Sequence, residues 1–244
     1  MYFCYYGNIL STITPLETLG CIIASVCHDV GHPALTNRFL IQNKDDLAIQ
    51  YNDISVLENM HASTTYSLLN KPGCNILENI SDEDWYRVRK LVLNLILDTD
   101  LSRHFEILGR FRARSSDLSQ FSLENYENKQ TILSMGLKCA DLGHSAKTIE
   151  LHQKWTALIC EEFFRQGDLE KLRKQPISMY CDRETTDIGK SQAGFIKNVC
   201  LPLFETWNCF LNSDVINLTC LEQLKSNYNF WKEKAKERVL ECSP

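Results

Sequence analysis

The sequence predicts an all-α fold, and three features of its 244 residues indicate this class. Residues that break helices are few, with 10 Gly and 6 Pro. Apolar residues recur at helical spacing in several long segments, and no segment alternates apolar and polar residues as a half-buried strand does. Hydrophobic residues make up 44% and charged residues 23% of the chain, the balance of a globular protein. We therefore expect one compact helical domain over residues 1–244.

Helix start signals define the elements of the N-terminal half. Pro15 suits the first turn of a helix and precedes a long apolar stretch. Asp53 is a candidate N-cap, and Ser81 with Asp84 has the spacing of a capping box. We expect helices over residues 15–30, 54–70 and 81–96.

The C-terminal half carries four further helical segments. Gly167 marks the expected end of one helix, because glycine is common directly after a helix. Pro202 lies inside another apolar segment and predicts a kink there. The last segment ends in the charged run WKEKAKERVLE, which is typical of a solvated helix face. We expect helices over residues 128–142, 147–166, 187–212 and 216–240.

The charge and the cysteines limit the class of protein. The net charge of −5 argues against a partner that is a nucleic acid polymer, since such binding depends on basic surface. The 11 cysteines are odd in number and scattered, which indicates reduced thiols in a cytoplasmic protein. The start lacks the basic region of a signal peptide. The longest apolar runs are shorter than the roughly 20 residues that span a bilayer, so we expect no membrane segment in this chain.

The first candidate metal site is the run CHDVGHPALTN, which ends the first long apolar helix. His28 and His32 are four residues apart, a spacing that places side chains on one side of a helix. Pro33 disfavours helical backbone at His32, so the helix should end there. Together with Asp29, these side chains suit zinc, manganese or iron. A purely structural His-Asp pair at a helix end is the alternative.

A second apolar helix ends in a similar way. The stretch over residues 132–140 leads into Asp141, and Gly143 offers a helix stop. A carboxylate at the C-terminal end of a helix is unfavourable, because it meets the negative end of the helix dipole. A bound cation would compensate this charge, so Asp141 is a second candidate metal ligand.

A third pattern suggests a site for a flat ring. Gln192 and Phe195 are three residues apart, and hence on one face of the expected helix over residues 187–212. An amide beside an aromatic ring can hold a heterocycle by hydrogen bonds and stacking. The alternative is a core phenylalanine near a surface glutamine.

Taken together, six ordered segments resemble those of the class I 3′,5′-cyclic nucleotide phosphodiesterases. The resemblance runs from about Ile13 to Trp207 and is carried by HDVGHPALTNRFLI, YNDISVLEN, LDTDLSRH, KCADLGHSAK, HQKWTALICEEFFRQGD and SQAGFI followed by PLFETW. It implies an HD-type metal-dependent phosphohydrolase fold with a two-metal centre. The implied activity is hydrolysis of cAMP, cGMP or both to nucleoside 5′-monophosphates, in cyclic nucleotide signal transduction.

The resemblance also implies roles for individual residues. The implied metal ligands are His28, Asp29 and Asp141. The metals are two divalent ions, zinc and magnesium (or manganese), and Asp29 would bridge them. The residues implied around the water molecules of the second metal are His32, Glu58, Thr99 and Asp100, with Asn37 behind them. The implied substrate contacts are Gln192 with the purine, Phe195 and Ile159 as an apolar clamp, and His144 near the purine. The cyclic nucleotide is the expected partner, and homodimer formation stays open.

The family carries one motif that this sequence lacks. An upstream His-Asn-x-x-His segment supplies a general acid and a further zinc ligand, and the sequence from Met1 onward contains no match to it. The general acid histidine is therefore not present in this chain. We expect residues 1–244 by themselves to hydrolyse cyclic nucleotides slowly, since general acid catalysis contributes about 10²–10⁴-fold. The alternative is a noncatalytic relative that binds a cyclic nucleotide or pairs with an active partner.

Overall fold

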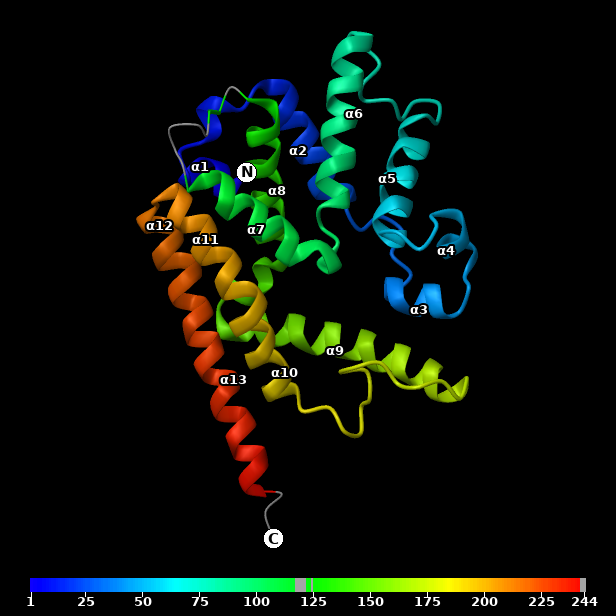
Figure 1. The fold of residues 1–244 in the computed structure, drawn as a ribbon, viewed down its shortest axis with the longest axis vertical. Helices are drawn as coiled ribbons and strands as arrows, with labels where there is room; N and C mark the ends of the chain where they lie inside the picture. Colours follow the sequence, from blue (N-terminus) through cyan, green and yellow to red (C-terminus); the bar gives the residue numbers. More distant parts are fainter. Residues whose placement is uncertain (117–121, 124, 242–244) are drawn as a thin grey trace. The chain divides into compact units, whose positions relative to one another are not determined.

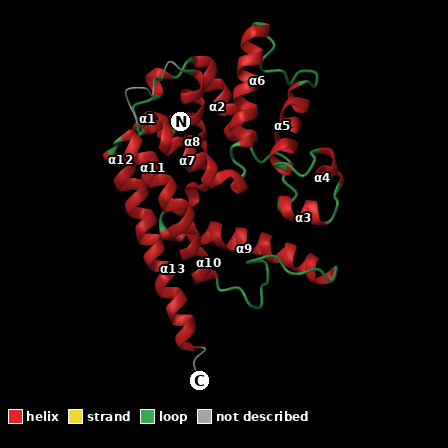
Figure 2. Ribbon diagram, viewed as in Figure 1, coloured by secondary structure: helices red, strands yellow, loops and turns green. Residues whose placement is uncertain are grey.

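The structure is a computed structural model that describes residues 1–116, 122–123 and 125–241. Every regular element in these ranges is helical, which confirms the all-α prediction (Figures 1 and 2). The chain forms two compact units, residues 1–140 and residues 141–244. No helix in the described part of the chain is both long and apolar enough to cross a membrane.

The first unit contains most of the helices. They are α1 (Tyr2–Tyr6), α2 (Pro15–Cys27), α3 (Asn37–Gln42), α4 (Asp46–Gln50), α5 (Val56–Leu69), α6 (Asp82–Leu97), α7 (His104–Ser115) and α8 (Tyr126–Asp141). Helices α2 and α6 pack closely: a Cβ atom on Gly20 would lie 2.9 Å from Cδ2 of Leu91. Glycine at this position therefore allows the apolar helix α2 to approach its partner.

Capping groups fix the starts of α2 and α6 as the sequence predicts. Thr14 and Glu17 form a complete capping box around Pro15, which occupies the first turn of α2. The Ser81 side chain accepts a hydrogen bond from the backbone of Asp84 at the start of α6. Each cap satisfies backbone donors that the first helical turn leaves without partners.

Two expectations about this unit are wrong. Asp53 does not cap α5: the helix begins at Val56, and its N-cap is Ser55, in a left-handed conformation with φ of 41°. Helix α2 ends at Cys27, so His28 and His32 do not share a helical face. His32 instead follows Gly31, whose φ of 75° turns the chain. The helix thus ends at Cys27, six residues before Pro33.

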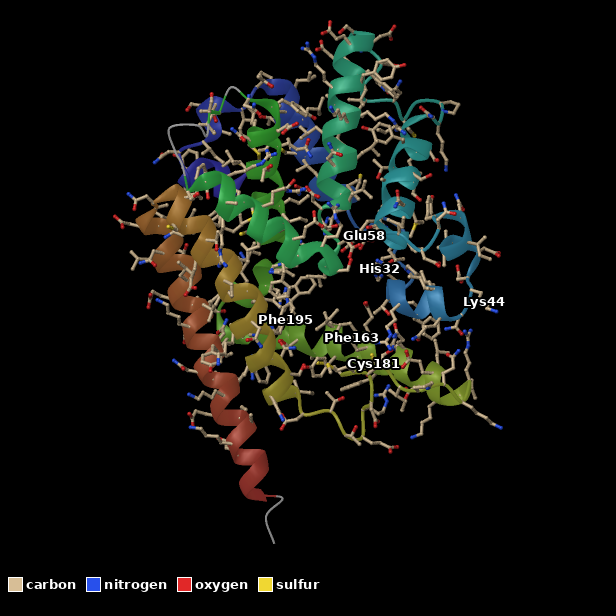
Figure 3. The ribbon with its side chains drawn as sticks, in the orientation of Figure 1. His32, Lys44, Glu58, Phe163, Cys181 and Phe195 are labelled. Atoms are coloured by element: carbon tan, nitrogen blue, oxygen red, sulfur yellow. The ribbon has the colours of Figure 1, made fainter. Side chains whose placement is uncertain are left out.

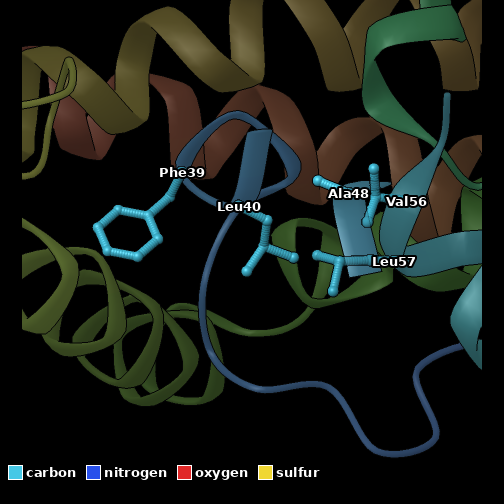
Figure 4. Packing of buried hydrophobic residues seen from close by; sticks show 5 residues of the cluster. All are labelled: Phe39, Leu40, Ala48, Val56 and Leu57. Carbon is cyan, nitrogen blue, oxygen red and sulfur yellow. The ribbon is translucent and has the colours of Figure 1, made fainter. Parts of the chain in front are cut away.

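The short helices α3 and α4 are held to α5 by a small apolar core. Its buried members are Phe39, Leu40, Ala48, Val56 and Leu57 (Figure 4). Each side chain comes from one of these three helices, so the core fixes the start of α5 relative to the segment after His32. This placement matters because Asn37 and Glu58 flank the core.

The second unit is built around two long helices. Its helices are α9 (Ile149–Leu172), α10 (Ile188–Phe195), α11 (Leu201–Leu211), α12 (Asp214–Ile216) and α13 (Glu222–Glu241). Helix α10 packs closely on α13, since a Cβ atom on Gly189 would lie 2.8 Å from the backbone nitrogen of Ala235. The predicted helix over residues 187–212 is interrupted by a π-helical turn at Ile196–Cys200, and Pro202 lies in the first turn of α11.

Gly167 does not end α9, contrary to the prediction from sequence. The helix continues to Leu172, and the backbone of Cys181 lies against Gly167. A Cβ atom here would lie 1.9 Å from the carbonyl oxygen of Cys181, which only glycine avoids. One turn later, the buried carboxylate of Glu170 accepts hydrogen bonds from the backbone N–H and the hydroxyl of Ser178, at 2.6 and 2.7 Å. These hydrogen bonds therefore hold the segment after α9 against the helix.

Candidate metal centre

Three side chains from two segments bring ligand atoms together. His28 and Asp29 follow α2 directly, and Asp141 is the last residue of α8. One ligand atom from each of the three lies within 4.8 Å of the other two. The second unit begins at Asp141, but this residue is still part of α8, and the helix fixes its position. The side chain of Asp29 is 62% exposed, so a ligand can reach it.

Hydrogen bonds orient the imidazole of His28. Its Nδ1 lies 3.0 Å from the carbonyl oxygen of Ser25, which can only accept a hydrogen bond. Nδ1 therefore carries the proton in the neutral ring, and the lone pair resides on Nε2. This Nε2 lies 3.3 Å from Oδ2 of Asp29. A carbonyl that fixes the tautomer of a histidine in this way is typical of metal ligands.

His61 is a neighbour of this cluster that the sequence analysis does not single out. The side chain is buried in α5, and its Nδ1 donates to the carbonyl oxygen of Val30 at 2.8 Å. The Nε2 atom lies 3.8 Å from Oδ1 of Asp29, and the ring stacks on His32 at a centroid distance of 5.6 Å. Burial lowers the pKa of His61, which favours its neutral form. No sequence pattern indicates it, because only the fold brings α5 beneath residues 29–32.

Asn37 and Glu58 form a second polar group in the same unit, and Figure 3 labels Glu58 and His32. The Asn37 amide donates to Oε2 of Glu58 at 2.9 Å and accepts from the backbone N–H of Leu57 at 2.8 Å. Burial raises the pKa of Glu58; the bond from Asn37 opposes this shift, and the charges of Asp100 and Asp29 add to it. A cation near these three acids would offset their mutual repulsion.

Residues 98–100 connect α6 to this polar group, and all three are buried. Asp100 accepts hydrogen bonds from the hydroxyl of Ser55 at 2.7 Å and from the backbone of Ser102 at 2.8 Å. Thr99 donates its hydroxyl to the carbonyl of Ile96. Ser55 belongs to a turn with left-handed backbone at Asn52, Asp53 and Ser55. The donor to Asp100 is thus presented by an unusual backbone conformation.

The residues present fit divalent metal ions. One imidazole and several carboxylates form a donor set that suits zinc, and carboxylates with water suit magnesium or manganese. Two ligand atoms that each lie about 2.0–2.2 Å from one ion are at most about 4.4 Å apart. The observed spread of up to 4.8 Å among His28, Asp29 and Asp141 is therefore closed by small side-chain rotations.

The second unit positions His144 through a chain of buried donors. The indole N–H of Trp231 donates to Nε2 of His152 at 2.8 Å. The proton of the neutral His152 ring is consequently on Nδ1, which lies 3.2 Å from Nδ1 of His144. His144 accepts at this atom, and its own proton resides on Nε2. Burial lowers the pKa of both rings, that of His152 to about 4.

Gln192 and Phe195 both belong to α10, while Ile159 lies on α9. Gln192 is buried, and its Oε1 atom has no hydrogen-bond partner among the described residues. Buried polar atoms normally have a partner, so a bound ligand that donates a hydrogen bond would satisfy this oxygen. Phe195, labelled in Figure 3, and Ile159 are half-buried. Their position relative to the metal ligands stays a prediction.

The chain is similar in sequence to proteins of known activity. The sequence profile of the 3′5′-cyclic nucleotide phosphodiesterase family matches residues 1–223. A 3′,5′-cyclic-AMP phosphodiesterase of Drosophila melanogaster (isoform F) is 38% identical over 224 residues, covering 90% of this chain and 34% of that protein. The 3′,5′-cyclic-AMP phosphodiesterase 4C of Rattus norvegicus is 36% identical over 239 residues, covering 96% of this chain and 43% of the relative.

A third relative has a broader name. The dual 3′,5′-cyclic-AMP and -GMP phosphodiesterase beta of Plasmodium falciparum is 39% identical over 216 residues, covering 88% of this chain and 19% of that protein. The chain thus spans less than half the length of each of these relatives. The profile match nevertheless includes every residue of the candidate site, from His28 to Phe195. The chain belongs to the 3′5′-cyclic nucleotide phosphodiesterase family.

Proposed function

We propose that this chain forms the metal-binding part of a hydrolase that converts 3′,5′-cyclic nucleotides to nucleoside 5′-monophosphates. The observation that carries the proposal is the cluster of ligand atoms from His28, Asp29 and Asp141. The names of the relatives support cAMP as a substrate, and one of them supports cGMP as well. The proposed metals are zinc and magnesium, or manganese in place of magnesium.

In this proposal the chain's residues hold the reacting groups. His28, Asp29 and Asp141 would hold the ions, and Asp29 offers the exposed carboxylate among them. The side chains of His32, Glu58, Thr99 and Asp100 orient water molecules around the second ion. Bound divalent ions neutralise the phosphate charge and lower the pKa of a water molecule. Hydrolysis then forms a bond from the water oxygen to phosphorus, and the 3′ oxygen leaves with a proton.

The base of the nucleotide is assigned to the second unit. The amide of Gln192 offers a donor and a buried acceptor to the purine edge, and Phe195 with Ile159 encloses its faces. His144 presents an Nε2–H donor, because Trp231 and His152 fix its tautomer. A fixed donor at the base edge selects for an acceptor on the purine, since an unmatched buried donor is costly.

The experiment compares Asp29→Asn with the wild type and with Asp53→Asn, which changes an exposed acid of the same unit. Metal content and 5′-monophosphate release from cAMP and cGMP are measured with zinc and magnesium. Bis(4-nitrophenyl) phosphate serves as a third substrate, because its phenolate leaves without protonation and needs no general acid. We expect metal-dependent cleavage of this diester by the wild type and Asp53→Asn.

Asp29→Asn should lose bound metal and cleave the activated diester at least about 10²-fold more slowly, since metal ligation underlies the reaction. The proposal fails if Asp29→Asn binds metal as tightly as the wild type, or if the wild type cleaves the diester equally well with a chelator present. Slow release from cyclic nucleotides together with rapid cleavage of the diester would locate the deficit in the proton donor.

A further inference from the structure

A cavity of about 340 Å³ lies in the first unit, and none of the proposed metal ligands or water-binding residues lines it. Its walls come from the C-terminal end of α6, from the length of α7 with the residue before it, and from the first turns of α8. This volume is at the lower end of the range of small-molecule sites, about 300–1,000 Å³. The cavity is therefore large enough for a small ligand.

Three arginines line one side of the cavity: Arg103, Arg110 and Arg114. Arg110 and Arg114 are four residues apart on one face of α7, and Arg103 is the residue directly before this helix. The lining contains two acidic residues, Asp98 and Glu127, against these three cations. Among the lining residues the cations thus outnumber the acids by one, in a chain whose net charge is −5, and Glu106 outside the lining pairs with Arg103 and Arg110. Such a local surplus attracts anions.

The arginines make one or two contacts each with acids, most of them long. Arg103 lies 3.3 Å from Asp98 and 3.5 Å from Glu106, Arg110 lies 3.5 Å from Glu106, and Arg114 lies 3.1 Å from Glu127. A guanidinium group has five N–H donors, so one or two contacts leave further donors for other partners. Ion pairs that remain partly exposed contribute little to stability, and an anion can replace them at small cost.

Arg110 supplies a more specific indication of a ligand. Its Nε atom is buried and has no hydrogen-bond partner within the described ranges. A buried charged donor without a partner is unfavourable, because it has lost water without gaining an acceptor. An oxyanion in the cavity would satisfy this donor.

The walls from α6 and α8 add neutral polar groups beside the acids Asp98 and Glu127. Asn94 donates to Gln130 at 2.9 Å, which joins α6 to α8, and Thr131 follows in the same turn. The carboxylate of Asp98 is engaged by the hydroxyl of Ser134 at 2.7 Å, besides its contact with Arg103. Amide and hydroxyl groups of this kind can bind the hydroxyl groups of a sugar, while the arginines bind a charged group.

We propose that this cavity binds a phosphomonoester dianion, with its phosphate oxygens on Arg103, Arg110 and Arg114. A tetrahedral phosphate has oxygens for three guanidinium groups at once, and guanidinium forks match its geometry. A planar carboxylate offers only two oxygens, so three arginines favour the phosphate. The amide and hydroxyl groups of Asn94, Gln130 and Thr131 face the hydroxyl-bearing part of the ester. This inference is independent of the proposed hydrolase activity.

The test is calorimetric titration of the chain with ribose 5-phosphate and with inorganic phosphate, at constant ionic strength. A chelator is present throughout, so that metal-bound phosphate does not contribute. Arg110→Gln is compared with Arg87→Gln, which removes the same charge from an exposed position on α6. We expect the wild type and Arg87→Gln to bind alike and Arg110→Gln to bind at least about tenfold more weakly, the scale of one lost hydrogen bond to a charged group.

A second readout guards against a folding defect in Arg110→Gln. The side-chain Nε–H resonance of Arg110, assigned by its absence in that variant, should shift in the wild type as ribose 5-phosphate is added. The proposal is overturned if the wild type binds neither probe, if Arg110→Gln binds as the wild type does, or if the resonance does not move. Equal or tighter binding of succinate would also overturn it, because the site would then not be selective for phosphate.

Discussion

The contact between Gly167 and Cys181 allows a stability prediction to be worked from the structure. In Gly167→Ala the new Cβ atom would lie 1.9 Å from the Cys181 carbonyl oxygen and 2.6 Å from the carbonyl carbon. Ordinary contacts start at 3.4 Å, so the segment must retreat by 3.4 − 1.9 = 1.5 Å. Both obstructing atoms are backbone, and no side-chain rotation can relieve the clash.

A retreat of this size breaks the bonds from Ser178 to the buried carboxylate of Glu170. Two hydrogen bonds to a charged group are worth about 3–6 kcal/mol, and the gain from replacing glycine in a helix offsets about 1 kcal/mol. We therefore expect Gly167→Ala to lower the free energy of unfolding by about 2–5 kcal/mol.

Urea denaturation followed by circular dichroism measures this loss. Gly109→Ala in α7 is the matched control, because its added Cβ meets no atom of the described residues within 4 Å. The control should be as stable as the wild type or up to about 1 kcal/mol more stable. If the free energy of unfolding of Gly167→Ala fell by less than about 1 kcal/mol, the segment after α9 would move at little cost, and its hydrogen bonds to Glu170 would not hold it in place.

Two further predictions concern single buried side chains. The folded pKa of His152 is about 4, below its ordinary value of 6.5, so the native state resists protonation of this ring. The contribution of this ring to stability is complete above its ordinary pKa and is lost as the pH falls toward the folded pKa. Between about pH 7.5 and 5, the free energy of unfolding of the wild type should therefore fall by about 2 kcal/mol more than that of His152→Phe. Equal pH slopes in the two proteins would contradict this. Asn37→Ala should cost about 1–3 kcal/mol, because Glu58 and the backbone of Leu57 both lose a partner. Asn37→Asp should recover the bond from Leu57 but repel Glu58, and full stability of either variant in thermal melts would rule out this role.

The parts of the fold that the sequence predicts are those with local causes. Helices α2 and α6 start where they were expected, because Thr14 and Ser81 carry capping chemistry within four residues of the helix start. Helices α3 and α4 have five or six residues each, which is too short for a helical period to show. The prediction that Gly167 ends α9 is wrong because the contact that requires this glycine lies 14 residues away, at the backbone of Cys181. Local patterns cannot reveal an approach made by a distant segment.

The candidate site, too, contains residues that the sequence predicts and a residue that only the structure reveals. The end of each apolar helix indicated Asp29 and Asp141, and the fold supplies the proximity of their carboxylates. His61 stayed hidden because it occupies an ordinary buried position in α5 and becomes a neighbour of Asp29 only through the turn after α2. Residues whose role depends on a partner far along the chain need the structure, whereas residues that end a helix against its dipole can be recognised beforehand.

The left-handed turn before α5 has a consequence for efforts to make this protein more heat-resistant. Asn52, Asp53 and Ser55 have φ values of 53°, 62° and 41°, and each such conformation is costly for a residue other than glycine. Replacing such a residue with glycine relieves this conformational cost. Ser55, however, presents its hydroxyl to Asp100 from this conformation, so glycine there would remove a hydrogen bond of 2.7 Å. Asp53 is exposed and carries no such contact in the described structure, so glycine is the safer substitution there. At Ser55, by contrast, a gain in heat resistance would come at the expense of the geometry around Asp100.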